Sequence, residues 1–60
     1  MPVIIVEMKE GRNIEQKQQL ADDLTTAFVK QGLSPDVVQV IFHDNPRHNW
    51  AKSGKLDIKV

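Results

Sequence analysis

Apolar and polar residues follow a strand-like pattern at two places in this 60-residue chain. The segment from Val3 to Met8 is almost continuously apolar and rich in β-branched residues, with Glu7 as its one charge. This composition predicts a strand that is buried on both faces. The segment from Val38 to Asp44 predicts a second strand, because its side chains fall into two alternating sets. Val38, Val40 and Phe42 form one set, and Gln39, Ile41 and His43 form the other.

Between these strands the apolar residues change to helical spacing, which predicts a helix from Ile14 to Gln31. Asn13 is placed to cap its first turn, and Gln16 three residues later completes a capping-box pattern. Gly32 is placed to end it. Beyond it, Ser34-Pro35-Asp36 predicts a turn with Ser34 as its cap. The apolar face of this helix is formed by Leu20, Leu24, Ala27 and Phe28.

The last sixteen residues predict a short C-terminal hairpin or arm. A polar loop from Asn45 to Asn49 leads to Trp50, and Ser53-Gly54 reads as a turn. Apolar and polar residues then alternate from Lys55 to Val60, typical of a short half-buried strand. The expected fold class is α/β: a β-α-β protomer with two parallel strands, one long crossover helix and this hairpin or arm, in a single domain over residues 1–60.

Two strands and one helix cannot cover both faces of their own sheet, so a second copy of the chain is expected to cover the free face. A chain this short is marginally stable alone, and without cysteine it has no disulfides to compensate. Eight basic and eight acidic residues give zero net charge, which argues against nucleic-acid binding. No apolar run approaches the ~20 residues of a membrane span. A soluble, cytoplasmic homo-oligomer is expected.

Pro2 and Arg12 are the first candidates for chemistry. Removal of Met1 would expose the secondary amine of Pro2, a base or nucleophile, whereas retention of Met1 leaves a tertiary amide without basicity. Arg12 follows Gly11 in a loop, where an arginine is either a solvated charge or a bidentate clamp for a carboxylate. The extended segment between them is ~25–30 Å long. If both contact one small substrate, they must come from different subunits.

The two histidines and the single tryptophan carry weaker signals. His43 and His48 are five residues apart across a proline-containing loop, which is not a helical metal-binding spacing. They are expected to be ordinary surface or partly packed histidines. Trp50 is either a core or interface anchor or the wall of a pocket.

In combination, three motifs resemble those of the 4-oxalocrotonate tautomerase family within the tautomerase superfamily. They are Met1-Pro2 before a β-branched strand, then Glu10-Gly11-Arg12, then Glu15-Gln16-Lys17 at a helix start. The resemblance covers nearly the whole chain and implies a β-α-β protomer assembled as a hexamer, a trimer of dimers, without metal or cofactor. It further implies that Pro2 is the catalytic base, that Arg12 binds a substrate carboxylate, and that Trp50 is an apolar wall favouring the neutral amine.

Gln39 is the main departure from the family's pattern. Many members carry a second arginine there, in the second strand, which polarises the substrate carbonyl. Glutamine can donate hydrogen bonds but brings no charge, and Arg47 or His48 from the next loop are possible substitutes. Three functions stay open: enol–keto isomerisation of a small unsaturated 2-hydroxy or 2-oxo acid, hydratase, dehalogenase or decarboxylase chemistry on the same fold, and a non-catalytic oligomeric scaffold.

Overall fold

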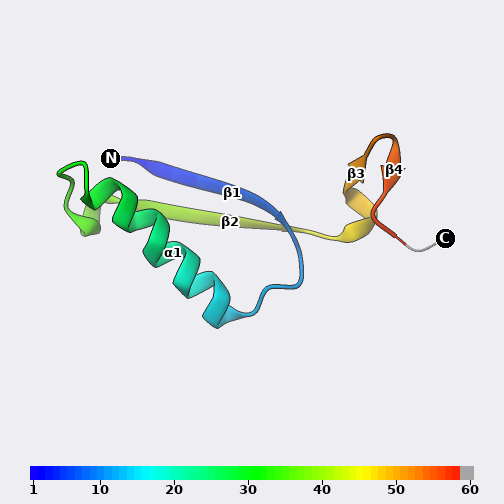
Figure 1. Ribbon diagram of the computed structural model, residues 1–60, viewed down its shortest axis with the longest axis horizontal. Coiled ribbons are helices and arrows are strands. Elements are labelled where there is room, and N and C mark those ends of the chain that lie inside the picture. Colours follow the sequence, from blue (N-terminus) through cyan, green and yellow to red (C-terminus); the bar gives the residue numbers. More distant parts are fainter. Residues whose placement is uncertain (59–60) are drawn as a thin grey trace.

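The computed structural model describes residues 1–58 and confirms the expected β-α-β arrangement with a C-terminal hairpin (Figure 1). Strands β1 and β2 are parallel, with Val3 beside Gln39 at one end and Lys9 beside Asn45 at the other. Helix α1 connects them. Lys59 and Val60, the end of the predicted alternating strand, lie outside the described residues. The elements are β1 Val3–Lys9, α1 Ile14–Val29, 3₁₀ turn η1 Pro35–Val37, β2 Gln39–Asn45, 3₁₀ turn η2 Arg47–Asn49, β3 Ala51–Lys52 and β4 Lys55–Leu56.

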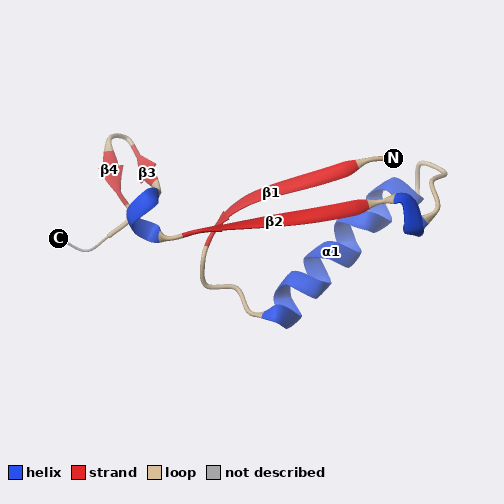
Figure 2. Ribbon diagram, turned by 180° about the vertical axis from the view of Figure 1, so that it is seen from behind, coloured by secondary structure: helices blue, strands red, loops and turns tan. Residues whose placement is uncertain are grey.

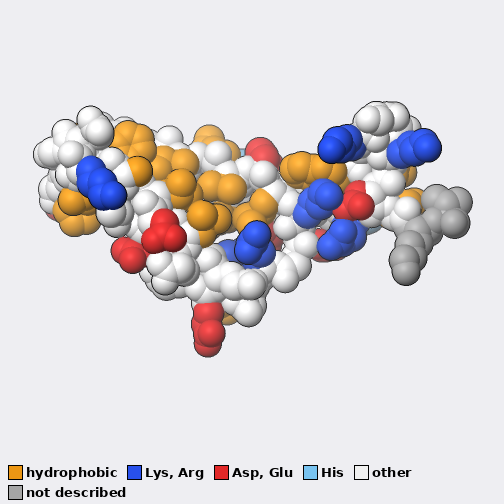
Figure 3. Space-filling model, in the orientation of Figure 1, with side chains coloured by type: hydrophobic (Ala, Val, Ile, Leu, Met, Phe, Trp, Pro, Cys, Tyr) orange, Lys and Arg blue, Asp and Glu red, His pale blue; other side chains and the backbone are white. Residues whose placement is uncertain are grey.

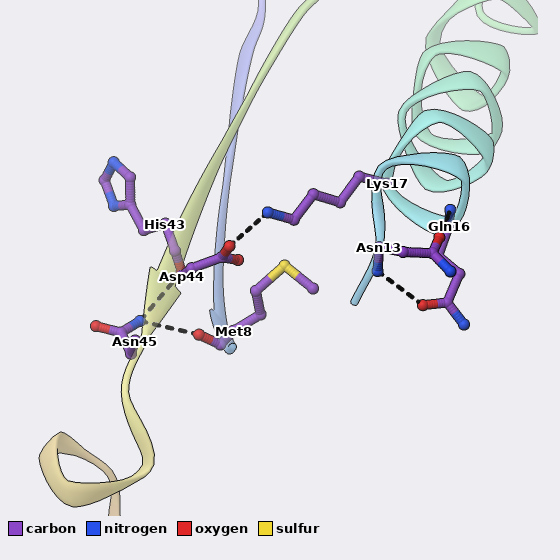
Figure 4. A network of polar contacts seen from close by, with 7 residues as sticks. All are labelled: Met8, Asn13, Gln16, Lys17, His43, Asp44 and Asn45. Carbon is purple, nitrogen blue, oxygen red and sulfur yellow. Dashed lines mark hydrogen bonds and ion pairs between the residues drawn. The ribbon is translucent and has the colours of Figure 1, made fainter. Parts of the chain in front are cut away.

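Helix α1 begins as its sequence predicts and ends two residues earlier. The Asn13 side chain accepts a hydrogen bond from the Gln16 N–H at 2.8 Å, and the Gln16 side chain accepts one from the Asn13 N–H at 3.0 Å (Figure 4). The last helical residue is Val29 rather than Gln31. The chain turns away there because Gly32 has a φ of +95°, which glycine adopts without steric cost.

The second strand begins at Gln39, one residue later than predicted. Val38 instead closes η1, since its N–H donates to the carbonyl of Pro35 at 3.3 Å. The expected capping role of Ser34 is wrong: its hydroxyl contacts the carboxylate of Asp36 and makes no capping hydrogen bond.

Helix α1 covers one face of the two-stranded sheet. Side chains alternate along both strands between half-buried and exposed, and the helix contributes its own half-buried stripe. An ion pair between Lys17 and Asp44 joins the first turns of the helix to β2 on this covered side (Figure 4). The half-buried apolar side chains are Ile4, Val6 and Met8 of β1, Val40 and Phe42 of β2, and Leu20, Ala21, Leu24 and Phe28 of α1.

The opposite face of the sheet is uncovered, so the expectation of a strand buried on both faces is wrong for the single chain. Seen from behind, the strands lie in front of the helix with no element over them (Figure 2). Val3, Ile5 and Ile41 on this face are 50%, 57% and 43% exposed, and no side chain among residues 1–58 is fully buried. The surface area is 4932 Å², against about 3,950 Å² for a compact monomer of this mass.

The C-terminal hairpin projects beyond the sheet, at the end away from the amino terminus (Figure 1). Ala51 pairs with Leu56 and Lys52 with Lys55. Ser53 and Gly54 both have positive φ, the conformation that a tight hairpin turn requires, and this confirms the predicted turn. Leu56 is 48% exposed, more than the half-buried strand that was expected. Over residues 1–58, the chain forms no helix of the length and apolarity needed to cross a membrane.

Candidate active site

Arg12 and Trp50 line one open hollow of about 480 Å³. It lies where β1 and β2 both end, because the carboxyl ends of parallel strands meet at the same edge of a sheet. The loop after β1 carries Arg12 to this edge, and η2 after β2 carries Trp50 to it. The hollow is lined by Glu7, Met8, Lys9, Glu10, Gly11, Arg12, Arg47 and Trp50.

The loop after β1 is fixed directly before Arg12. The N–H of Glu10 donates to the carbonyl of Asn45 at 2.9 Å, which extends the pairing of the strands by one bond. Gly11 then turns the chain with a φ of +128°, a conformation that strongly favours glycine. Within residues 1–58, Arg12 forms no ion pair, in contrast to Arg47, which pairs with Asp57. The guanidinium of Arg12 is therefore free to bind an acidic ligand.

Trp50 forms a wall of the hollow and is not part of a closed core. Its side chain is half-buried. The backbone N–H of Trp50 donates to the carbonyl of Arg47 at 3.2 Å, which closes η2. The Lys9 ammonium lies 5.8 Å from the centre of the ring, within the range of a cation–π contact. Trp50 thus lines the hollow in the single chain, and its role as a pocket wall or as an interface anchor stays a prediction.

Pro2 and Gln39 lie together at the other end of the sheet. The N–H of Gln39 donates to the carbonyl of Pro2 at 3.1 Å, and neither residue lines the hollow. The seven residues of β1 that separate the two ends span about 20 Å. The four candidate residues thus form two pairs in one chain, Pro2 with Gln39 and Arg12 with Trp50. A small molecule in the hollow cannot reach Pro2 of the same chain.

Asp57 pairs with two of the three cations around the hollow, so that Arg12 is the cation there without an ion pair among residues 1–58. Lys9, Arg12 and Arg47 line it together with Glu7 and Glu10. In the space-filling view, Lys and Arg side chains gather at this end of the molecule around the arm (Figure 3). Such a surface suits a ligand with an acid group.

Glu7 is held on the uncovered face by two neighbours from β2. The Nδ1 atom of His43 lies 2.7 Å from one carboxylate oxygen, and the side-chain amide of Asn45 donates to the other at 3.1 Å. These hydrogen bonds, that of His43 above all, hold the pKa of Glu7 below its usual range. The Asn45 amide also lies 3.1 Å from the carbonyls of Met8 and His43, which fixes its orientation (Figure 4).

The carboxylate of Glu7 is therefore the partner of His43, whose side chain lies half exposed on the surface of β2. His48 lies in η2, whereas His43 lies in β2. Residues 1–58 contain no group of three or more His, Asp or Glu side chains that could hold a metal ion.

Asp57 is the residue at this site that sequence reasoning missed. Its carboxylate accepts contacts from Lys9 at 3.0 Å and Arg47 at 2.8 Å. The hydrogen bond from Lys9 and the charges of both cations hold the pKa of the Asp57 carboxyl below its usual range. In the sequence Asp57 is one polar residue of an alternating strand, and no local signal distinguishes it.

Known proteins resemble this chain over nearly its whole length. The family model described as "Tautomerase enzyme" matches residues 2–56. A probable tautomerase from Bradyrhizobium diazoefficiens is 41% identical over 60 residues, which cover 98% of this chain and 90% of the relative. The 2-hydroxymuconate tautomerase of Comamonas testosteroni is 38% identical over 55 residues, which cover 90% of this chain and 87% of the relative.

A solved structure shows the same fold. It is that of a heterohexamer 4-oxalocrotonate tautomerase from Chloroflexus aurantiacus J-10-fl, with a TM-score of 0.87 and 29% identity. The match covers 95% of this chain and 94% of that one. The resemblance that the sequence motifs predicted is thereby confirmed at the level of the fold.

Proposed function

Because the chain belongs to the tautomerase family, we propose that it is a cofactor-independent isomerase. It interconverts the enol and keto forms of a small unsaturated 2-hydroxy or 2-oxo acid. The relative from Comamonas testosteroni, a 2-hydroxymuconate tautomerase, supports this class of substrate. Arg12, which lines the hollow and forms no ion pair among residues 1–58, supports an acid as well.

The observation that carries the proposal is the separation of the candidate residues into two pairs. Pro2 and Gln39 lie at one end of β1, and Arg12 and Trp50 lie at the other. A complete site therefore forms where the amino-terminal end of one chain meets the hollow of another. The uncovered face of the sheet, with Val3, Ile5 and Ile41, is the surface through which copies of this one-domain chain assemble. A homohexamer is the proposed assembly, in line with the heterohexameric relative.

The proposed reaction is a proton transfer through the amine of Pro2, which removal of Met1 exposes. The nitrogen takes the proton of the enol hydroxyl, and the electrons of the broken O–H bond form the carbonyl. The conjugated double bonds shift by one position, and the protonated amine returns its proton to the carbon at the far end. Atoms and electrons balance without any other reactant, and the amine is regenerated. An appropriately placed base contributes about 10²–10⁴-fold to such a step.

The other three residues position the substrate and tune the amine. The Arg12 guanidinium binds the carboxylate in a bidentate manner, which fixes the orientation of the conjugated chain. The ring of Trp50 excludes water, and with the charge of Arg12 it disfavours the protonated amine. The side-chain amide of Gln39 donates a hydrogen bond to the oxygen that becomes the carbonyl, without the charge that an arginine would bring.

The test is a comparison of wild-type protein with Pro2→Ala on 2-hydroxymuconate, followed by its change in ultraviolet absorbance. The mass of each intact protein is measured first, so that only chains without Met1 are compared. We expect Pro2→Ala to lose about 10²-fold or more in kcat. Equal rates for the two proteins would refute the role of Pro2. A chain that keeps Met1 in its native host would favour the non-catalytic scaffold instead.

A further inference from the structure

The C-terminal arm, which is the β3–β4 hairpin with Asp57 and Ile58, has few internal contacts that hold it in place. Its two strands pair over two residues each, and an isolated hairpin of any length is at best marginally stable in water. Its apolar side chains Leu56 and Ile58 are 48% and 47% exposed, so burial contributes little. Contacts outside the hairpin must therefore fix where it lies.

Asp57 provides these contacts to three different parts of the chain. A single carboxylate oxygen, Oδ2, accepts from Lys9 Nζ at the end of β1 and from Arg47 Nη1 in η2. The backbone N–H of Asp57 donates to the carbonyl of Trp50 at 2.8 Å. The arm is thus joined to the end of the sheet, to η2 and to Trp50 by one residue.

These contacts converge on Trp50, at its backbone and at its ring. Lys9, one of the two cations that Asp57 binds, lies over this ring at 5.8 Å from its centre. Arg47 is the other cation, and it lines the hollow together with Trp50. Its backbone carbonyl accepts a hydrogen bond from the backbone N–H of Trp50. An isolated surface ion pair contributes little, but here one carboxylate joins two cations, and the backbone N–H of the same residue holds the carbonyl of Trp50. The side chain of Asp57 is 35% exposed, the least of the three charges.

We propose that Asp57 is a positioning residue of the hollow, which orients the Trp50 wall by holding Lys9 and Arg47 against it. It does not touch the substrate. The inference rests on the proposed use of the hollow as the substrate site, and it adds the arm to the parts of the chain that build that site. When Asp57 loses its charge, Lys9 and Arg47 separate, the arm leaves η2, and the Trp50 ring becomes more open to water.

Trp50 is the only tryptophan of the chain, so its fluorescence reports directly on this wall. The experiment compares wild type, Asp57→Asn and Asp57→Glu by acrylamide quenching of Trp50 and by kcat and KM on 2-hydroxymuconate. Asp22→Asn is the matched control, because it removes the same charge from an exposed position on α1. Circular dichroism and light scattering check that each protein folds and assembles as the wild type does.

We expect Asp57→Asn to increase the quenching of Trp50 and to lower kcat/KM about tenfold, because a wall more open to water no longer disfavours the protonated amine of Pro2. Asp57→Glu, which keeps the charge, should recover most of both losses. Asp22→Asn should behave as wild type. If Asp57→Asn matches Asp22→Asn in quenching and in kcat/KM, the positioning role is wrong while the proposed function stands.

Two further outcomes are also decisive. If no protein turns over the substrate, the proposed function fails, and quenching alone then tests the wall: unchanged quenching in Asp57→Asn overturns the inference. If Asp57→Asn does not fold, Arg47→Gln is used, because it keeps Asp57 and removes one of its two cations. Increased quenching in this second variant supports the role, and wild-type quenching overturns it.

Discussion

Two inactive variants should restore each other if Pro2 and Arg12 act in one site from different chains. Pro2→Ala removes the proposed base, and Arg12→Ala removes the proposed carboxylate ligand. Each variant alone is expected to lose most activity. In a mixed oligomer, some sites receive Pro2 from the Arg12→Ala chain and Arg12 from the Pro2→Ala chain. Those sites contain both groups intact.

The size of the recovery follows from the geometry of β1. Seven residues of strand separate the two ends by about 20 Å, far more than a small unsaturated acid can span, so no site is built from one chain. With equal amounts of the two variants and random assembly, each of the two groups comes from the right chain half of the time. About a quarter of the sites in a symmetric assembly should then be wild type.

The assay uses the two variants with different affinity tags, expressed together and purified through both tags in turn. Activity on 2-hydroxymuconate is compared with that of each variant alone and of wild type. A mixture of wild type with Pro2→Ala is the control, and it should keep about half of its sites. A mixed oligomer of normal size that is no more active than its parents would refute the claim that the site is shared between chains.

Three further outcomes are expected. Ile5→Lys puts a charge on the uncovered sheet face, where burial of Ile5 between copies would stabilise the assembly by about 1 kcal/mol per chain. Light scattering should therefore show a smaller species for Ile5→Lys, whereas Ile14→Lys on α1 should keep the wild-type mass. Asn13→Ala removes the capping box and should lower the free energy of unfolding by about 1 kcal/mol, measured in urea, whereas Asn13→Asp, which still caps, should not. Because the folded-state pKa of Glu7 is lowered by His43 and Asn45, its stabilisation is present above the ordinary glutamate pKa and is lost as the pH falls through the lowered value. Glu7→Gln should therefore unfold with a weaker pH dependence in that acid range, followed by circular dichroism; an unchanged acid transition would contradict the pairing.

The sequence predicted the order of the elements well, because their signals are local. The Asn13–Gln16 capping box, Gly32 after the helix and the Ser53-Gly54 turn each act within a few residues. The predicted boundaries of the elements were wrong by a residue or two where two local structures compete for one residue. Val38 fits a strand by its side chain, but its N–H is used to close η1, so the strand begins one residue later.

The candidate site was only partly predictable for the same reason. The length of the first strand is local information, and it sufficed to predict that Pro2 and Arg12 lie at opposite ends of it. Asp57 depends on contacts with residues 10 and 48 positions earlier in the chain, Arg47 and Lys9. No periodicity marks such a residue, and the η2 turn that brings Arg47 to it was predicted only as a polar loop.

The lack of any fully buried side chain in residues 1–58 makes the stability of this protein depend on how much of it is present. For a chain that completes its core only by association, folding and assembly are one equilibrium, and its midpoint moves with protomer concentration. Dilution then lowers the fraction of chains that are assembled and folded. Newly made chains pass through their most vulnerable state before they meet a partner, with Val3, Ile5 and Ile41 open to any other apolar surface.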